Sequence, residues 1–142
     1  KWAATSLVSS LCIIWLVVIY VVTGKILGIH DSIPTLFWSR ILAMLISVMA
    51  ITAVQNLLSL MLHSFALPVA IAFLGCLSGV AFIMKGLYFL TPYSLLIYGA
   101  GSTSLTESLN LPMVLISASI WIFASIAVGI LFIKNTDVRT HV

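Results

Sequence analysis

Charged residues are spaced so unevenly along this chain that they leave four long uncharged segments. The 142 residues contain six Lys and Arg and three Asp and Glu. The uncharged segments are residues 2–24, 41–84, 86–106 and 108–133. A transmembrane helix needs about 20 apolar residues, because the hydrocarbon layer is about 30 Å thick and each helical residue rises 1.5 Å. Each segment is therefore long enough to cross a membrane.

The turn signals between these segments predict where the chain crosses. The uncharged run 41–84 would measure about 66 Å as one helix, so it has to cross twice. Its reversal is predicted at Leu62–Pro68, where His63 and Ser64 precede a proline that suits a first helical turn. The sequence thus predicts four transmembrane helices, at about residues 3–23, 35–62, 67–84 and 112–133.

The connection between the third and fourth predicted spans, residues 85–111, is half apolar. Thr91–Ser94 is expected to break the helix, Leu95–Gly101 is apolar again, and Ser104–Glu107 has the spacing of a capping box. An apolar segment of this kind does not stay in water. Short interfacial or re-entrant helices are therefore predicted in this region.

Composition narrows the fold to one class. Hydrophobic residues make up 63% of the chain, more apolar surface than a soluble domain of this size can bury. Residues 2–24 lack the charged start and the cleavage site of a signal peptide, so a retained helix is predicted. We predict an all-α, polytopic helical membrane protein, with residues 1–142 in a single transmembrane domain.

Few reactive side chains are available for chemistry. Three carboxylates in connections or tails cannot form a paired acid–base site, and no glycine-rich phosphate loop is present. Cys12 and Cys76 lie in the middle of spans without a nearby thiol or His, which disfavours a disulfide or a metal site. The net charge of +3 comes without a basic cluster, so no nucleic-acid partner is expected. The sequence predicts no enzyme activity and no cofactor in this chain.

Charge does not decide the orientation in the membrane. Four spans place both termini on one side, together with Lys1, Lys134 and Arg139. The opposite side would carry Lys25, Arg40 and Lys85, an equal number of cations.

Small residues mark candidate helix contacts. Gly75 and Gly79 form a GxxxG pattern in an apolar helix, and Ala72 extends the same face. This face either packs inside the chain, which the sequence favours, or forms a subunit interface. A weaker stripe of the same kind on the last span contains Ser117, Ser125 and Gly129.

Four polar residues in or near the spans have two interpretations each. Arg40 either extends to the membrane interface or acts as a buried functional charge. Gln55 and Asn56 either bond to neighbouring helices or line a substrate path. His63 is interpreted as a residue of the turn at the membrane interface and not as a proton relay.

Aromatic residues divide into two groups by depth. Trp2, Trp38, Tyr88 and Tyr93 lie near predicted interfaces, where aromatic belts form. Trp15 and Trp121 lie in the middle of spans, and we expect both to pack in the core.

The order of these features resembles a known family. The tightly joined pair of spans at Gln55–Pro68, the break at Thr91–Ser94 and the tail Phe132–Arg139 resemble the C-terminal part of type 2 ABC exporter permeases. Within them the chain looks most like permease subunits of lantibiotic (bacteriocin) self-protection transporters of Gram-positive bacteria. Those permeases have six spans, and the resemblance covers all 142 residues as spans three to six.

The resemblance implies a transport subunit in a bacterial plasma membrane with cytoplasmic termini, which places the His63 turn on the cytoplasmic side and residues 85–111 outside. Its partners would be an ATPase subunit that binds ATP, a second permease chain, the lipid bilayer and an exported amphipathic peptide or other hydrophobic substrate. The first two spans and the segment that contacts the ATPase would precede Lys1, so a fragment unable to pump alone is expected. The alternatives are a stand-alone four-helix scaffold or assembly protein and, less favoured, a pore or ion-coupled carrier.

Overall fold

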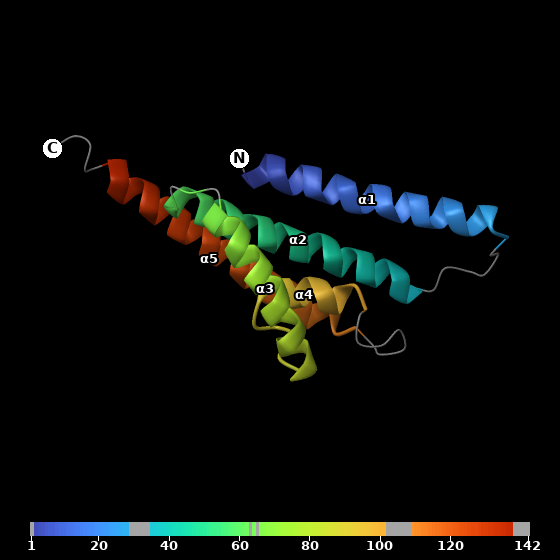
Figure 1. Ribbon diagram of the computed structural model, residues 1–142. Helices are drawn as coiled ribbons and strands as arrows, with labels where there is room; N and C mark the ends of the chain where they lie inside the picture. Colours follow the sequence, from blue (N-terminus) through green and yellow to red (C-terminus); the bar gives the residue numbers. More distant parts are fainter. Residues whose placement is uncertain (1, 29–34, 63, 65, 102–108, 138–142) are drawn as a thin grey trace.

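The computed structural model describes residues 2–28, 35–62, 64, 66–101 and 109–137, and every regular element within these ranges is an α-helix (Figure 1). The helices are α1 (Trp2–Ile26), α2 (Thr35–Met61), α3 (Ala66–Met84), α4 (Pro92–Gly99) and α5 (Leu111–Asp137). Four of them, α1, α2, α3 and α5, are long and apolar enough to cross a membrane. The prediction of an all-α polytopic membrane protein is confirmed.

The ends of the long helices lie close to the predicted ends of the spans. Two ends, at Thr35 and Met84, coincide with the predicted ones, the others differ by one to four residues, and the largest difference is at α5, which continues to Asp137. The reversal between α2 and α3 falls within Leu62–Pro68, although His63 itself lies outside the described residues. The expected capping box at Ser104–Glu107 also lies outside them.

Helix α2 lies at the centre of the fold, since it contacts each of the other four helices. Helix α1 runs antiparallel to it: the Tyr20 and Phe37 rings stack 5.8 Å apart at one end. At the other end, the Asn56 amide donates to the Thr5 hydroxyl at 2.9 Å. Helix α1 contacts none of the other described helices, and in Figure 1 it lies on the far side of α2 from α5.

Helix α5 runs parallel to α2 and forms the most extensive helix pair with it. Early residues of both helices share one buried cluster. Late residues also meet, because a Cβ atom on Gly129 would lie 3.8 Å from Leu57 Cδ1. Two crossings in the same direction are expected of the second and fourth spans of a chain that reverses at each connection.

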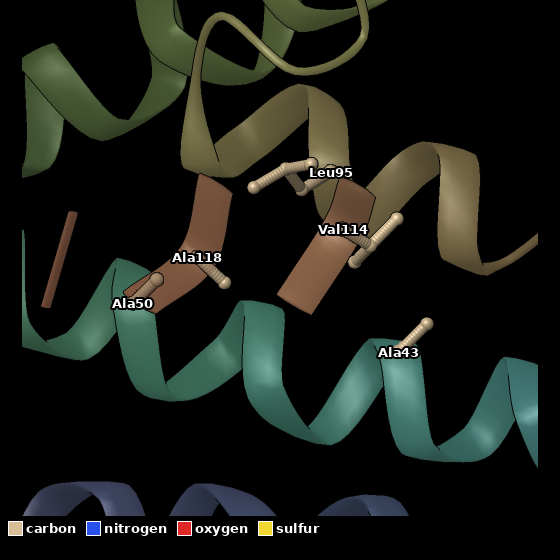
Figure 2. Packing of buried hydrophobic residues seen from close by; sticks show 5 residues of the cluster. All are labelled: Ala43, Ala50, Leu95, Val114 and Ala118. Carbon is tan, nitrogen blue, oxygen red and sulfur yellow. The ribbon is translucent and has the colours of Figure 1, made fainter. Parts of the chain in front are cut away.

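Helix α3 diverges from α2, and the short helix α4 packs against both of them (Figure 1). The contacts of α3 with α4 are more extensive than those with α2, and α3 makes no contact with α5 within the described residues. The core lies where α2, α4 and α5 meet. Leu95 of α4 lies there with Val114 and Ala118 of α5 and with Ala43 and Ala50 of α2 (Figure 2).

Candidate functional site

Helix α4 re-enters the layer of long helices from the end at which α3 leaves it. The Tyr93 ring, in the first turn of α4, lies against Gly75. Gly75 is nine residues before the end of α3 at Met84, about 14 Å along the helix axis. The first turn of α4 thus reaches about halfway along α3. We call the residues that hold α4 in this position the seat of α4 and treat the seat as the candidate site.

The start of α4 satisfies its own backbone groups, as a helix end at membrane depth must. The Thr91 hydroxyl accepts from the Ser94 amide at 3.2 Å, and the Ser94 hydroxyl accepts from the Thr91 amide at 3.3 Å. The Ser94 hydroxyl also donates to the Tyr88 carbonyl at 2.8 Å. Pro92 occupies the first turn, where no amide hydrogen is needed. The break expected at Thr91–Ser94 is therefore the capped beginning of a new helix.

The GxxxG face of α3 forms one wall of the seat. A Cβ atom on Gly75 would lie 2.6 Å from the Tyr93 ring. One on Gly79 would lie 3.1 Å from the Ser94 backbone nitrogen and 3.3 Å from the Tyr93 carbonyl carbon. Helix α4 of the same chain therefore occupies this face. Ala72, one turn before Gly75, is half-buried on α3.

Helix α2 forms the opposite wall. A Cβ atom on Gly99, near the end of α4, would lie 3.3 Å from the Ala43 methyl group and 3.4 Å from the Met44 backbone nitrogen. Glycine thus allows close approach at both walls: Gly75 and Gly79 of α3 at one, and Gly99 of α4 at the other. Close backbone approach of this kind is how helices associate in lipid, where apolar burial alone gives no driving force.

A polar bond joins the start of α4 to α2. The Gln55 side-chain amide donates to the hydroxyl of Tyr93, a residue that is 7% exposed. Tyr93 was expected near a membrane interface, and that prediction is wrong because its ring lies against Gly75, about 14 Å from the end of α3. Gln55 is therefore placed in a helix–helix contact, the first of its two interpretations.

Arg40 lies at the other end of α4. Gly101, just after the helix, adopts a left-handed conformation with φ +81°, and a Cβ atom there would collide with the Arg40 guanidinium. The cation thus lies beside the carboxyl end of α4, where the helix dipole favours positive charge. Arg40 and Gln55 contact opposite ends of one short helix.

Helix α5 and an aromatic pair complete the seat. The Ser117 hydroxyl donates to the Phe89 carbonyl at 2.6 Å, which satisfies a backbone group of the segment that leads into α4. The Tyr88 and Tyr98 rings stack 4.0 Å apart and nearly parallel, at 8°. This stack joins that leading segment to the last turn of α4.

Asn56 contributes to a different contact from its neighbour Gln55. Its amide donates to the Thr5 hydroxyl of α1 at 2.9 Å and to the Thr52 carbonyl at 2.7 Å. Nearby, the Trp2 indole donates to the Met49 carbonyl at 3.3 Å. Asn56 therefore joins α1 to α2 and lies outside the seat of α4.

The remaining sequence-predicted residues are distributed over other surfaces. Ser125 and Gly129 are buried on α5, and Gly129 faces Leu57. Cys12 and Cys76 are both exposed free thiols. Trp121 packs against the core as expected. Trp15 does not: its side chain is 65% exposed, because it points away from α2, the one described helix that α1 contacts.

Sequence analysis missed the residues that matter most for packing α4. Leu95, Ala43 and Ala50 are fully buried, but alanine and leucine occur throughout such a chain and carry no pattern that sets these three apart. Ser94 could have been found, because Thr91 and Ser94 have capping spacing. No group of three or more His, Cys, Asp or Glu side chains able to hold a metal ion occurs in the described part of the chain.

The Gln55–Tyr93 bond should contribute measurably to the stability of the fold. We expect Gln55→Leu and Tyr93→Phe each to lower the free energy of unfolding in detergent by about 0.6–1.7 kcal/mol, the range measured for interhelical hydrogen bonds in membranes. The double variant should lose less free energy of unfolding than the two single variants added together, because each single variant already breaks the same hydrogen bond. Ser59→Ala, which removes an exposed hydroxyl bonded within its own helix, is the control. Additive single effects would show that the two side chains do not interact.

The chain matches no family model, no curated protein and no solved structure.

Proposed function

We propose that this chain is the membrane-spanning permease subunit of an ATP-driven exporter in a bacterial plasma membrane. ATP would be bound and hydrolysed by a separate ATPase subunit. The substrate would be an amphipathic peptide of the lantibiotic type or another hydrophobic molecule, moving outward between this permease and a second one. The chain itself would perform no chemical step.

The seat of α4 is the observation that carries this proposal. A short helix that re-enters between the last two spans fits the region that exporter permeases of this type place on the outer side of the membrane. Helix α4 lies between α3 and the α2–α5 pair, and α3 packs chiefly on α4. A transporter needs parts that can take two arrangements relative to each other. The small contact between α2 and α3 makes α3 a candidate for such a part, because α4 is held by α2 as well.

The scaffold alternative loses its main support. It relied on Gly75 and Gly79 as a face for assembling several copies, and this face is filled by α4 of the same chain. The transport proposal does not require the Gly75–Gly79 face to contact another copy of the chain.

Transport by the gene product that carries this chain provides the test. The gene product should be co-expressed with the ATPase subunit that the proposal requires, and inside-out vesicles should be given a fluorescent cationic amphipathic peptide. We expect the tagged chain to co-purify with the ATPase and the vesicles to accumulate peptide only with ATP. The control is an ATPase whose phosphate-loop lysine is replaced, which cannot hold the nucleotide phosphates. Equal accumulation with the inactive ATPase, or no association with it, would exclude the proposal.

A further inference from the structure

The last turns of α2 carry a polar face in an otherwise apolar helix. The four polar residues in this part of α2 are spaced i, i+3, i+4 and i+7, and they are Thr52, Gln55, Asn56 and Ser59. At about 100° per residue, all four fall within an arc of about 100°. Ser59 lies about 3 Å along the axis from the end of the helix at Met61, and Thr52 about 14 Å. This surface, which we call the amide face, therefore extends from the membrane surface well into the hydrocarbon layer.

Two neighbouring helices are bonded to the edges of the amide face. Asn56 bonds to Thr5 of α1, and Gln55 bonds to Tyr93 of α4. Helices α1 and α4 make no contact with each other among the described residues. Ser59, which lies between Gln55 and Asn56 around the helix, is exposed. The middle of the amide face is therefore open to a ligand.

The hydrogen bonds of the amide face use most of its donors. The Ser59 hydroxyl donates to the Gln55 backbone carbonyl at 2.8 Å, and the Thr52 hydroxyl donates to a carbonyl of the preceding turn at 3.0 Å. Both hydrogens of the Asn56 amide are used, on the Thr5 hydroxyl and the Thr52 carbonyl. One hydrogen of the Gln55 amide is bonded to α4. The face thus offers a ligand four side-chain oxygens as acceptors and one remaining N–H.

The side-chain carbonyl oxygens of Gln55 and Asn56 reach the molecular surface. Neither oxygen accepts a hydrogen bond within the described residues. No buried side-chain nitrogen or oxygen in the described part of the chain lacks a partner, so these two oxygens are not buried. An unpaired carbonyl at membrane depth costs free energy, because hydrocarbon supplies no donor. A group that donates hydrogen bonds therefore gains by binding at the amide face.

An ammonium group matches the amide face better than a neutral group does. It has three donors and no acceptor, and its charge makes each hydrogen bond about twice as strong as a neutral one. Residues 41–84 carry no charge, so no cation on this part of α2 or on α3 repels it. We propose that the amide face binds the primary ammonium group of the exported amphipathic substrate. The substrate as ligand rests on the proposed function, which places this end of α2 on the cytoplasmic side, from which an exported molecule comes.

Binding of two matched peptides to the full gene product in nanodiscs, without ATP, tests the amide face. The probe is a fluorescent amphipathic peptide with blocked ends and a single lysine. Its control is the same peptide with that lysine acetylated, which removes the charge. We expect the lysine peptide to bind at least ten times more tightly, as hydrogen bonds to a charged group allow. Equal affinities of the two peptides would refute the proposal.

Charges placed at Ser59 test the position of the site. Ser59→Lys should weaken binding of the lysine peptide by at least tenfold and Ser59→Asp should strengthen it, with little change for the acetylated peptide. The control is the same pair of changes at Ile130, an exposed residue of α5. Its neighbour Gly129 faces Leu57, which lies two residues and about 200° from Ser59. Ile130 is therefore at a similar depth on the opposite side of α2, and equal effects at both positions would overturn the proposal.

Gln55→Leu removes one of the acceptor oxygens. It also breaks the bond to Tyr93, so the matched variant is Tyr93→Phe, which breaks the same bond and keeps the oxygen. We expect the preference for the lysine peptide to fall about tenfold in Gln55→Leu and to fall less in Tyr93→Phe. Equal losses in the two variants would show that the Gln55 oxygen does not bind the ammonium group.

The vesicle assay separates this site from the transport proposal. ATP-driven accumulation of both peptides alike, without a difference in their binding, would uphold the exporter and refute the ammonium site. A lysine preference that Ser59→Lys abolishes, without any ATP-driven accumulation, would uphold the ammonium site and refute the exporter.

Discussion

Replacing Gly79 by leucine is expected to lower the free energy of unfolding by about 3 kcal/mol or more, at the upper end of overpacking effects. A Cβ atom on Gly79 would already lie 3.1 Å from the Ser94 backbone nitrogen, and that backbone is held by the capping bonds between Thr91 and Ser94. The neighbour therefore cannot move aside without loss of the cap. The measurement is reversible unfolding in detergent, supported by the yield of folded protein.

Gly24→Leu is the control for this prediction. Gly24 is also a helical glycine of a transmembrane segment, but a Cβ atom there would meet nothing within 4 Å. Its replacement should change stability little, so the difference between the two variants isolates the contact with α4. Equal stability of the Gly79→Leu variant and the wild type would mean that α3 faces lipid at this position and that α4 lies elsewhere.

Leu95→Ala is expected to destabilise the fold by about 2–5 kcal/mol, the range for leucine-to-alanine changes in packed cores. Leu95 is fully buried between α2 and α5 (Figure 2). The cavity would be lined by Ala43, Ala50 and Ala118, whose side chains are too short to fill it. The loss arises from missing dispersion contacts, which hold helices together in a membrane. Thermal unfolding with a circular dichroism readout gives the difference.

Leu90→Ala removes the same atoms a few residues earlier, where the side chain is exposed. This control should stay within about 0.5 kcal/mol of the wild type, as surface substitutions usually do. Equal losses at positions 90 and 95 would show that α4 does not sit in the core.

The polar contacts illustrate why part of the site was not predictable. Gln55 and Asn56 are neighbours in the sequence, yet Gln55 bonds to Tyr93, 38 residues later, and Asn56 to Thr5, 51 residues earlier. Adjacent residues point about 100° apart around a helix, so each faces a different neighbour. Without the positions of the other helices, no pattern in the sequence selects either partner.

The surroundings of the aromatic side chains were predicted from their depth in the membrane alone, and depth gave the correct surroundings for only some of them. Depth placed Tyr93 at an interface and Trp15 in the core, and both predictions are wrong. Tyr93 belongs to a segment that turns back into the membrane, so its distance from a charged residue says little about its depth. Trp15 is at mid-span as predicted, but depth does not reveal which way a side chain points.

The sequence by itself determined the four membrane-crossing helices and the apolar segment between the last two. The hydrocarbon thickness and the absence of charge constrain those features locally. Only the tertiary structure decided that α4 fills the GxxxG face, that Arg40 and Gln55 contact its two ends, and that Trp15 points outward. In a membrane any apolar helix face can face the lipid, so hydropathy does not predict which faces pack against other helices. That choice depends on close packing and hydrogen bonds between residues far apart in the chain.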